Sequence, residues 1–432
     1  MRTNKSSITV ATLAGLAAQA VLASQQDEAR GFLADSHLTL NLRHYYYNYD
    51  KKNGVADARD WAQGALLDYK SGFTRGTVGF GLDAFAYGVL KLDGYGSGVG
   101  NLTVDNDGDT HSFSHVGGAL KVRLSNTVLK YGIVQPVAPV FAAGGSRILP
   151  QTAQGFLLQS EELRGLALQG GHFTAATGWR GNSNSDRIMA AYAGVEVDSV
   201  DYLGGDYAIT DNLSVALYAA NYENVWRQYY GSGAYTFHLA ENQSLRLSGN
   251  LYRTLDQGRA RAGRIDTSAW SLAAAYAFGS HKLTLGYQQI DGDEPFDYVG
   301  FGSEASVGDS IYLANSVQIS DFNGPGEKSV QLRYDLDMSG YGVPGLSFMA
   351  RHIHGRAVDG SHADPGGAYA GVYGVGDSEQ ETDVEAKYVV QSGPAKDLMV
   401  RLRQAWHRGD TGGLGGGKDQ FRIVVQYPLS LF

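Results

Sequence analysis

Residues 36–47 read SHLTLNLRHYYY, a stretch in which leucines alternate with polar residues. Successive side chains of an extended strand point to opposite faces, so the three leucines share one face and the polar residues share the other. The same period of two recurs over residues 213–219, 283–288, 330–335, 398–403 and 421–427. This pattern predicts an all-β chain whose strands each have one apolar and one polar face.

Two architectures produce strands of this kind. A soluble sandwich buries the apolar face, whereas a membrane barrel turns that face outward to lipid and keeps the polar face around water. Aromatic residues gather at the ends of the strands, as in Tyr45 to Tyr47 and Trp406, where membrane barrels place their interfacial girdles. Backbone groups in lipid must pair among themselves, so the sheet must close into a ring. The deciding feature is a set of mid-strand arginines on the polar face: Arg43, Arg333, Arg401, Arg403 and Arg422.

The first residues predict export rather than fold. Arg2 and Lys5 precede an apolar stretch over residues 8–23 that ends in small residues, the arrangement of a secretory signal peptide. We therefore expect residues 1–23 to be a signal peptide and residues 24–432 to form a single outer-membrane β-barrel domain. Removing Arg2 and Lys5 changes the formal charge from -9 to about -11 (two positive charges fewer).

Composition excludes several classes of protein. The acidic balance leaves no basic face to neutralise phosphates, which argues against nucleic acid as a partner. After the signal peptide no run of 18 apolar residues occurs, which argues against membrane helices. The chain has no cysteine, so disulfides do not stabilise it.

The spacing of turns and loops predicts the size of the barrel. Short polar breaks at residues 211–212, 240–243 and 393–396 indicate tight periplasmic turns. Longer Gly- and Asp-rich stretches alternate with them and indicate extracellular loops: residues 94–110, 256–267, 291–309, 358–381 and 409–419. With hairpins of this length, about 409 residues after position 23 suit roughly 16–18 strands, enough to leave an aqueous channel.

Several longer motifs carry a resemblance to a known family. They are VAPVFAAGGSR at 137–147 followed by PQT at 150–152, PFDY at 295–298, SDFNGPGEKS at 320–329, AKYVVQSGPAKDL at 386–398 and QAWHR at 404–408. Together they resemble the OprD family of outer-membrane carboxylate channels over residues 31–432, with most similarity to the branch for basic amino acids and peptides. The resemblance implies an antiparallel barrel of about 18 strands, monomeric or weakly trimeric, with inward-folded constriction loops. It also implies permeation by carbapenem antibiotics.

The resemblance further implies which residues line the pore. Lys387, Arg401, Arg403 and Arg422 match the family's basic ladder, and Arg147 matches the arginine at the narrow point. Tyr192, Tyr298 and Asp321 match polar groups on the opposite side. One departure is Ile319, which stands where relatives carry a tyrosine. The loss of that hydroxyl leaves the substrate open, with aromatic carboxylates such as benzoate as the alternative.

The ladder has a physical interpretation of its own. Arg401 and Arg403 are two residues apart, about 7 Å on one strand face, and Arg422 is expected on the neighbouring strand. A carboxylate could pass between guanidinium groups through bidentate contacts, while Asp321 attracts a substrate's ammonium or guanidinium group. The alternative is that the arginines only balance lumen carboxylates such as Asp335. The expected partners are small carboxylate solutes, outer-membrane lipid and lipopolysaccharide.

Other motifs resemble enzyme and metal sites. Ser310 in Gly308-Asp309-Ser310, with His172 as base, would make an outer-membrane serine hydrolase, but no nucleophile-elbow motif frames the serine. Asp105, Asp107 and Asp109 begin like a calcium loop but lack its glycine and final glutamate. His352 and His354 share a strand face without a third ligand. We expect no enzyme activity, no metal and no cofactor. A third hypothesis, a structural barrel or adhesin without a conducting lumen, is disfavoured by the arginine ladder.

Overall fold

The computed structural model describes residues 24–432 except 53, 55, 96–110 and 411. The expected signal peptide at 1–23 and the acidic motif at Asp105, Asp107 and Asp109 therefore lie outside the described residues. Among those residues, no helix is long and apolar enough to cross a membrane.

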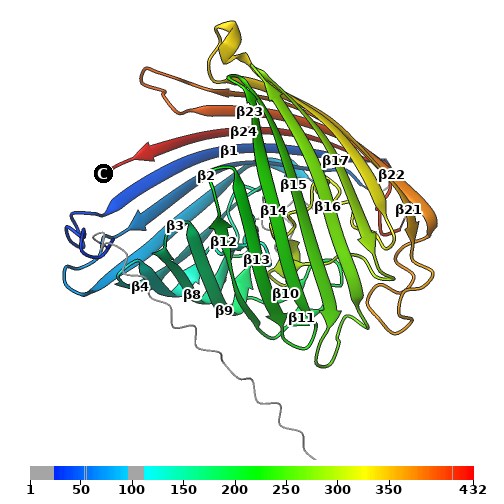
Figure 1. Ribbon diagram of the computed structural model, residues 1–432, viewed down its shortest axis with the longest axis horizontal. Coiled ribbons are helices and arrows are strands. Elements are labelled where there is room, and N and C mark those ends of the chain that lie inside the picture. Colours follow the sequence, from blue (N-terminus) through cyan, green and yellow to red (C-terminus); the bar gives the residue numbers. More distant parts are fainter. Residues whose placement is uncertain (1–23, 53, 55, 96–110, 411) are drawn as a thin grey trace, which may run out of the picture.

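The described residues form one antiparallel sheet of 18 strands that closes on itself (Figure 1). The first strand pairs with its neighbour in sequence and also with the last strand, so the ring has no free edge. The barrel strands are β1 (His37–Lys51), β2 (Ala58–Lys70), β3 (Val78–Tyr95), β4 (Ser112–Leu124), β5 (Thr127–Val134), β8 (Thr152–Leu163), β9 (Leu166–Thr177), β12 (Val200–Ala208), β13 (Leu213–Tyr222), β14 (Trp226–Ala240), β15 (Gln243–Asp256), β16 (Asp266–Phe278), β17 (His281–Asp291), β20 (Lys328–Asp337), β21 (Leu346–Asp359), β22 (Val375–Val389), β23 (Met399–Gly409) and β24 (Lys418–Ser430). The prediction of an 18-stranded barrel is confirmed.

Along the barrel strands, exposed and buried side chains alternate with the period of two that the sequence predicts. Leu217 on β13 is 70% exposed and Leu332 on β20 is 60% exposed, whereas their neighbours Tyr218 and Gln331 are each 4% exposed. The exposed leucines face outward, and the buried polar residues face a lumen filled by loops. This is the arrangement of a membrane barrel, in which the outer surface contacts lipid.

The short turns lie at the end of the barrel where the C-terminus lies, and the long loops lie at the other end (Figure 1). In barrels of this kind the short-turn end is periplasmic. The four-residue 3-10 helix η1 (Met338–Tyr341) occupies the turn between β20 and β21. One loop prediction is wrong in part: residues 358–381 are not all loop, because β22 already begins at Val375. Their polar composition suggests a loop, but on this strand the polar side chains face the lumen.

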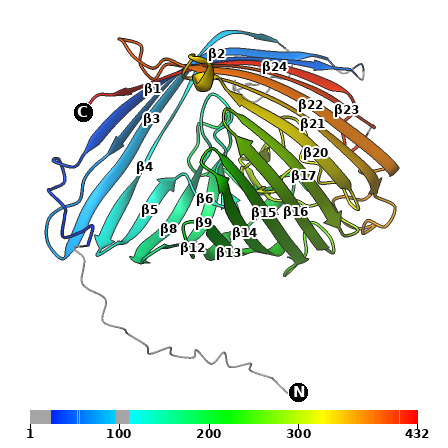
Figure 2. The same cartoon turned by 45° about the horizontal axis from the view of Figure 1, so that its top comes forward.

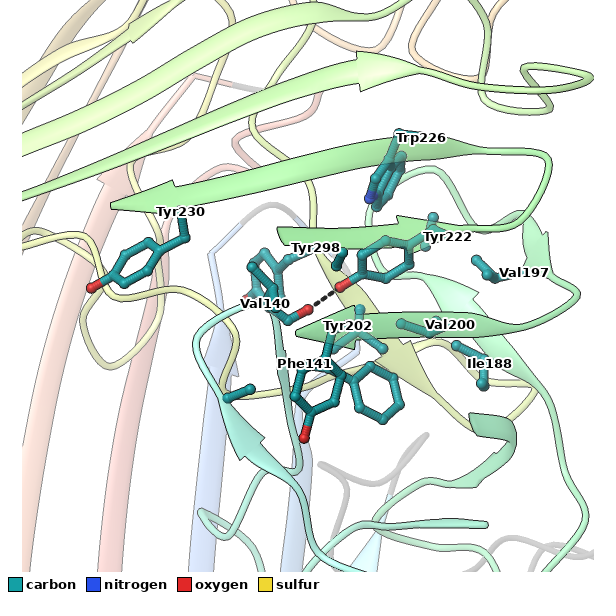
Figure 3. Close-up of a cluster of buried hydrophobic side chains, with 14 of the residues drawn as sticks. Val140, Phe141, Ile188, Val197, Val200, Tyr202, Tyr222, Trp226, Tyr230 and Tyr298 are labelled. Carbon is teal, nitrogen blue, oxygen red and sulfur yellow. Dashed lines mark hydrogen bonds between the residues drawn. The ribbon is translucent and has the colours of Figure 1, made fainter. Parts of the chain in front are cut away.

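Extracellular loops fold back into the lumen and form small sheets of their own (Figure 2). One is a hairpin of β6 (Val137–Ala138) and β7 (Phe141–Ala142), and the other joins β10 (Ile188–Ala190), β11 (Glu196–Val197), β18 (Val299–Phe301) and β19 (Ser306–Val307). Their apolar side chains pack against aromatic residues of the wall, and the Tyr222 hydroxyl of β13 donates to the Val140 carbonyl (Figure 3). Phe141 stacks on Phe173 of β9 with ring centres 4.8 Å apart. The lumen therefore narrows around a packed core that holds the loops in place.

Candidate channel constriction

The inward-folded loops and the wall enclose a cavity of about 370 Å³. Its lining includes six of the eight residues expected at the site: Arg147, Tyr192, Tyr298, Asp321, Arg403 and Arg422. Tyr47, Trp179, Asp309, Gln318 and Ile319 also line the cavity. The other two expected residues, Lys387 and Arg401, face each other across β22 and β23 outside this cavity, nearer the periplasmic end.

One side of the cavity is basic. Arg403 on β23 lies directly opposite Arg422 on β24, as the ladder interpretation requires. Arg422 Nη2 donates to the Gln318 carbonyl at 3.2 Å and to the side chain of Gln420 at 2.6 Å. Among the described residues, Arg422 Nε has no hydrogen-bond partner, and Arg403 Nε has only an ion pair with Glu385, so the protein does not saturate these guanidinium groups.

Carboxylates of the wall balance part of the ladder. Glu385 on β22 lies 3.1 Å from Arg403 Nε and 3.5 Å from Arg401 Nε. Arg333 pairs with Asp335 on the same strand, with an Nη2 to Oδ1 distance of 2.6 Å. The alternative interpretation, in which arginines only balance lumen acids, therefore fits Arg333. It does not account for Arg422, which has no carboxylate partner in the described part of the chain.

Aromatic rings hold the remaining arginine of the basic side. The Arg147 guanidinium lies 4.3 Å from the centre of the Trp179 ring and 5.1 Å from that of Tyr47. Arg422 lies 4.5 Å from the same Tyr47 ring. A guanidinium over a ring face is attracted electrostatically by the ring. Tyr47 therefore supports both arginines and keeps their charges close to each other.

Carboxylates of the inward-folded loops line the same cavity as these arginines. Asp321 Oδ2 accepts hydrogen bonds from the hydroxyls of Tyr192 at 2.6 Å and Tyr298 at 2.7 Å. Its Oδ1 accepts one from Ser316 at 2.5 Å. Asp309 lines the same cavity, and burial raises the pKa of its carboxyl. Tyr192, Tyr298 and Asp321 are thus brought together as expected, and the tyrosines orient the carboxylate.

A row of wall carboxylates fixes the loop that carries Asp321. Glu381 on β22 accepts hydrogen bonds from the backbone N–H groups of Gln318 at 3.1 Å, Ile319 at 2.9 Å and Ser320 at 2.8 Å. Glu379, two residues earlier, accepts one from the Ser320 hydroxyl at 2.8 Å. We did not predict these residues from the sequence. The sequence carries a signal for them, acids at every second position of residues 379–385, but the loop predicted over residues 358–381 conceals it.

A family model described as "outer membrane porin, OprD family" matches residues 30–431. The chain belongs to the OprD family. Porin D of Pseudomonas aeruginosa is 54% identical, with 99% of this chain and 98% of that protein covered. A crystal structure of P. aeruginosa OprD superposes with a TM-score of 0.85 at 52% identity, covering 96% of this chain and all of that one. A structure of P. aeruginosa OpdK with vanillate gives a TM-score of 0.81 at 35% identity, covering 93% of this chain and 100% of that one.

As an OprD-family porin, the protein is an integral outer-membrane channel and not an enzyme. The hydrolase alternative also fails on geometry. Ser310 is buried, and its Oγ accepts a hydrogen bond from the Ala142 N–H at 2.6 Å. His172 pairs with Asp201 at 2.7 Å on the face of the wall opposite to Phe173, which packs inside the barrel. Serine and histidine are therefore on different sides of the wall.

Asp297 joins three loops of this OprD-family porin. Its carboxylate accepts backbone N–H hydrogen bonds from Tyr192 at 3.0 Å, Ala193 at 2.8 Å and Tyr298 at 2.7 Å. The Tyr369 hydroxyl, from the loop between β21 and β22, donates to it at 2.8 Å. The two tyrosines that orient Asp321 thus depend on Asp297 for their backbone position.

This buried carboxylate predicts a pH dependence of loop packing. Burial raises the pKa of Asp297 to about 6, although the hydrogen bonds act in the opposite direction. An aspartate in an unfolded chain has a pKa near ~3.9, so the folded loops favour the protonated form. The resulting stabilisation, up to about 3 kcal/mol, is fully present below pH ~4 and is lost as the pH rises through about 6.

Hydrogen exchange would check this prediction. The amides of Tyr192, Ala193 and Tyr298 are expected to be better protected at pH 5 than at pH 8, after correction for intrinsic exchange rates. Asp297→Asn is expected to remove the difference, because an amide does not titrate in this range. Equal protection at both pH values in the unsubstituted protein would contradict the assignment.

Proposed function

We propose that this porin conducts small solutes that carry both a carboxylate and a positive group, with basic amino acids and short peptides as the preferred class. The observation that carries the proposal is that guanidinium groups and carboxylates line the same cavity of about 370 Å³. Arg147, Arg403 and Arg422 supply its positive charges, and Asp321 and Asp309 supply its carboxylates.

Opposed charges orient a solute across the direction of flow. A carboxylate can form charge-assisted hydrogen bonds with the guanidinium groups, while an ammonium or guanidinium group lies against Asp321. Conduction requires binding that is strong enough for a solute to enter and weak enough for it to leave. Glu385 supports this balance because it offsets part of the charge of Arg403.

Ile319 adds an apolar surface to the same cavity. Its backbone N–H is held by Glu381, so its position is fixed by the wall. Long charged side chains place their methylene stems on apolar surface while the charged end stays among polar groups. Ile319 therefore favours solutes with an aliphatic stem between two charges, as in lysine and arginine.

Aromatic carboxylates are the second candidate. The structure of OpdK with vanillate belongs to a relative that is 35% identical, compared with 52% for OprD. A benzoate-like solute would use the basic side of the cavity but has no positive group for Asp321. The acidic side therefore favours the basic amino acids.

Single-channel current in a planar bilayer tests the proposal. Arginine, a neutral sugar and benzoate are added in turn to one side of the purified barrel. We expect arginine alone to cause brief blockades. Blockades by benzoate alone would move the substrate to aromatic carboxylates, and equal blockade by the sugar would contradict selectivity of this kind.

A further inference from the structure

The outer face of the wall carries basic side chains that the channel does not use. Lys328 begins β20 and lies directly opposite Arg356 of β21. Both are exposed, as is His354, two residues before Arg356 on the same strand face. Their neighbours in sequence, Ser329 and Gly355, face inward and are buried, so these three basic side chains point out of the barrel.

The basic cluster of Lys328, His354 and Arg356 has no counterion among the residues that the structure describes. Neither Lys328 nor Arg356 pairs with a carboxylate within the described part of the chain. Asp291 and Asp359, at the ends of β17 and β21, form hydrogen bonds elsewhere rather than ion pairs with the cluster. Asp291 accepts hydrogen bonds from Trp270 Nε1 at 2.9 Å and from Gln289 at 2.5 Å, and Asp359 accepts them from Ser361. Like charges directly opposite each other across two strands are destabilising, so this arrangement favours an external anion.

The height of the cluster places it at the membrane surface. Lys328 lies opposite Gln289 of β17, and Gln289 lies opposite Trp270 of β16, so the cluster and this tryptophan share one row across the wall. Tryptophan is enriched where lipid headgroups meet water. The long loops begin just above the row, so this is the extracellular end of the wall, which faces the outer leaflet.

An apolar groove lies on the same face below the cluster. Its volume is about 420 Å³, and Ala350 and Ala386 contribute only small side chains to its lining. Larger outward-facing side chains border these alanines: Tyr334, Phe348, Val384, Leu402 and Phe421. Ala350 is six residues from Arg356 along β21, about 20 Å at ~3.3 Å per residue, which is roughly 14 Å of depth for a strand tilted by about 45°. Half of a bilayer's hydrocarbon core is about 15 Å thick, so the groove lies at the depth of acyl chains.

We infer that this face binds a phosphorylated, acylated glycolipid of the outer leaflet, the lipid portion of lipopolysaccharide. Its phosphates contact Lys328 and Arg356, and an acyl chain occupies the groove around Ala350 and Ala386. Phosphate oxygens accept strong charge-assisted hydrogen bonds from both kinds of side chain. The site lies outside the lumen, so the inference does not depend on the solute that the channel conducts.

Binding of purified lipid A to the full-length barrel in detergent tests the inference, with native mass spectrometry as the measurement. The double variant Lys328→Gln/Arg356→Gln is expected to bind about tenfold or more weakly, since each tenfold corresponds to ~1.4 kcal/mol. Arg227→Gln is the matched control, because Arg227 is an exposed, outward-facing arginine at the extracellular end of β14. Retention of the folded, heat-modifiable form in SDS gels shows that the variants assemble.

Each alternative outcome has a defined meaning. The inference is supported if only the double variant loses affinity and if lipid A without its phosphates binds weakly to the unsubstituted barrel. It is overturned if Arg227→Gln loses as much affinity, if the double variant binds normally, or if phosphatidylglycerol competes equally well. A change of oligomeric state in the double variant with normal lipid binding would assign the face to contact between copies of the chain instead.

Discussion

Glu381→Ala is expected to widen the constriction and raise single-channel conductance at least twofold. The substitution removes the acceptor for three backbone N–H groups, those of Gln318, Ile319 and Ser320. A buried donor left without a partner costs about 1–3 kcal/mol. Three unpaired donors together would cost about 5.5 kcal/mol, which is enough to move the equilibrium between a bound and a released loop from 1:99 to 99:1. The loop that carries Asp321 would then leave the wall for much of the time.

Planar bilayers and liposome swelling would measure the effect. We expect neutral sugars to permeate faster through the Glu381→Ala barrel and blockade by arginine to weaken, because Asp321 no longer faces the arginines. Glu381→Gln keeps one acceptor oxygen and should give an intermediate conductance. Glu223→Gln is the control, since Glu223 accepts a hydrogen bond from Ser199 and does not contact the loop. An unchanged conductance in Glu381→Ala would show that other contacts hold the loop.

Arg403→Ala is expected to lower arginine flux about tenfold at low substrate concentration while the barrel still assembles. A hydrogen bond to a charged group contributes about 1.5–3 kcal/mol, and ~1.4 kcal/mol corresponds to a factor of ten. The substitution also leaves Glu385 with Arg401 alone, 3.5 Å away, so the net charge of the basic side falls.

Flux into liposomes that contain the purified barrel would measure this loss. Lys396→Ala serves as the control, because Lys396 lies in an exposed periplasmic turn and its removal changes the total charge by the same amount. The loss should disappear for a neutral sugar, which makes no use of the guanidinium group. Equal arginine flux through the Arg403→Ala and unsubstituted barrels would exclude Arg403 from the binding side.

The barrel strands and their inward and outward faces could be predicted from the sequence, because both depend on a local pattern of residues. Alternation over residues 213–219 or 421–427 places each side chain inward or outward without knowledge of distant residues. The cross-strand position of Arg403 and Arg422 followed from the order of the last two strands. The grouping of Tyr192, Tyr298 and Asp321 came from the family resemblance, because three separate loop segments supply these residues.

Contacts between loops and wall could not be predicted in this way. Glu381 holds residues that are more than 60 positions away in sequence, and no local period links the two segments. Ser310 shows the opposite case. The local sequence Gly308-Asp309-Ser310 resembles the motif around a nucleophilic serine. Only the hydrogen bond from the Ala142 N–H shows that the Ser310 hydroxyl is buried in loop packing. The polar residues that begin β22 suggest a loop by composition, and only their partners inside the barrel explain why they form a strand.

Closure of the ring has a consequence for biogenesis. Arg422 lies on the last strand and Tyr47 on the first, 375 positions apart in sequence, and the seam between β1 and β24 brings them together. Contacts of such long separation form late, because the chain must first bring its ends together. The selective wall is therefore completed in the same step that seals the barrel. An assembly intermediate with an unzipped seam would leak, and it would also lack the ability to discriminate among solutes.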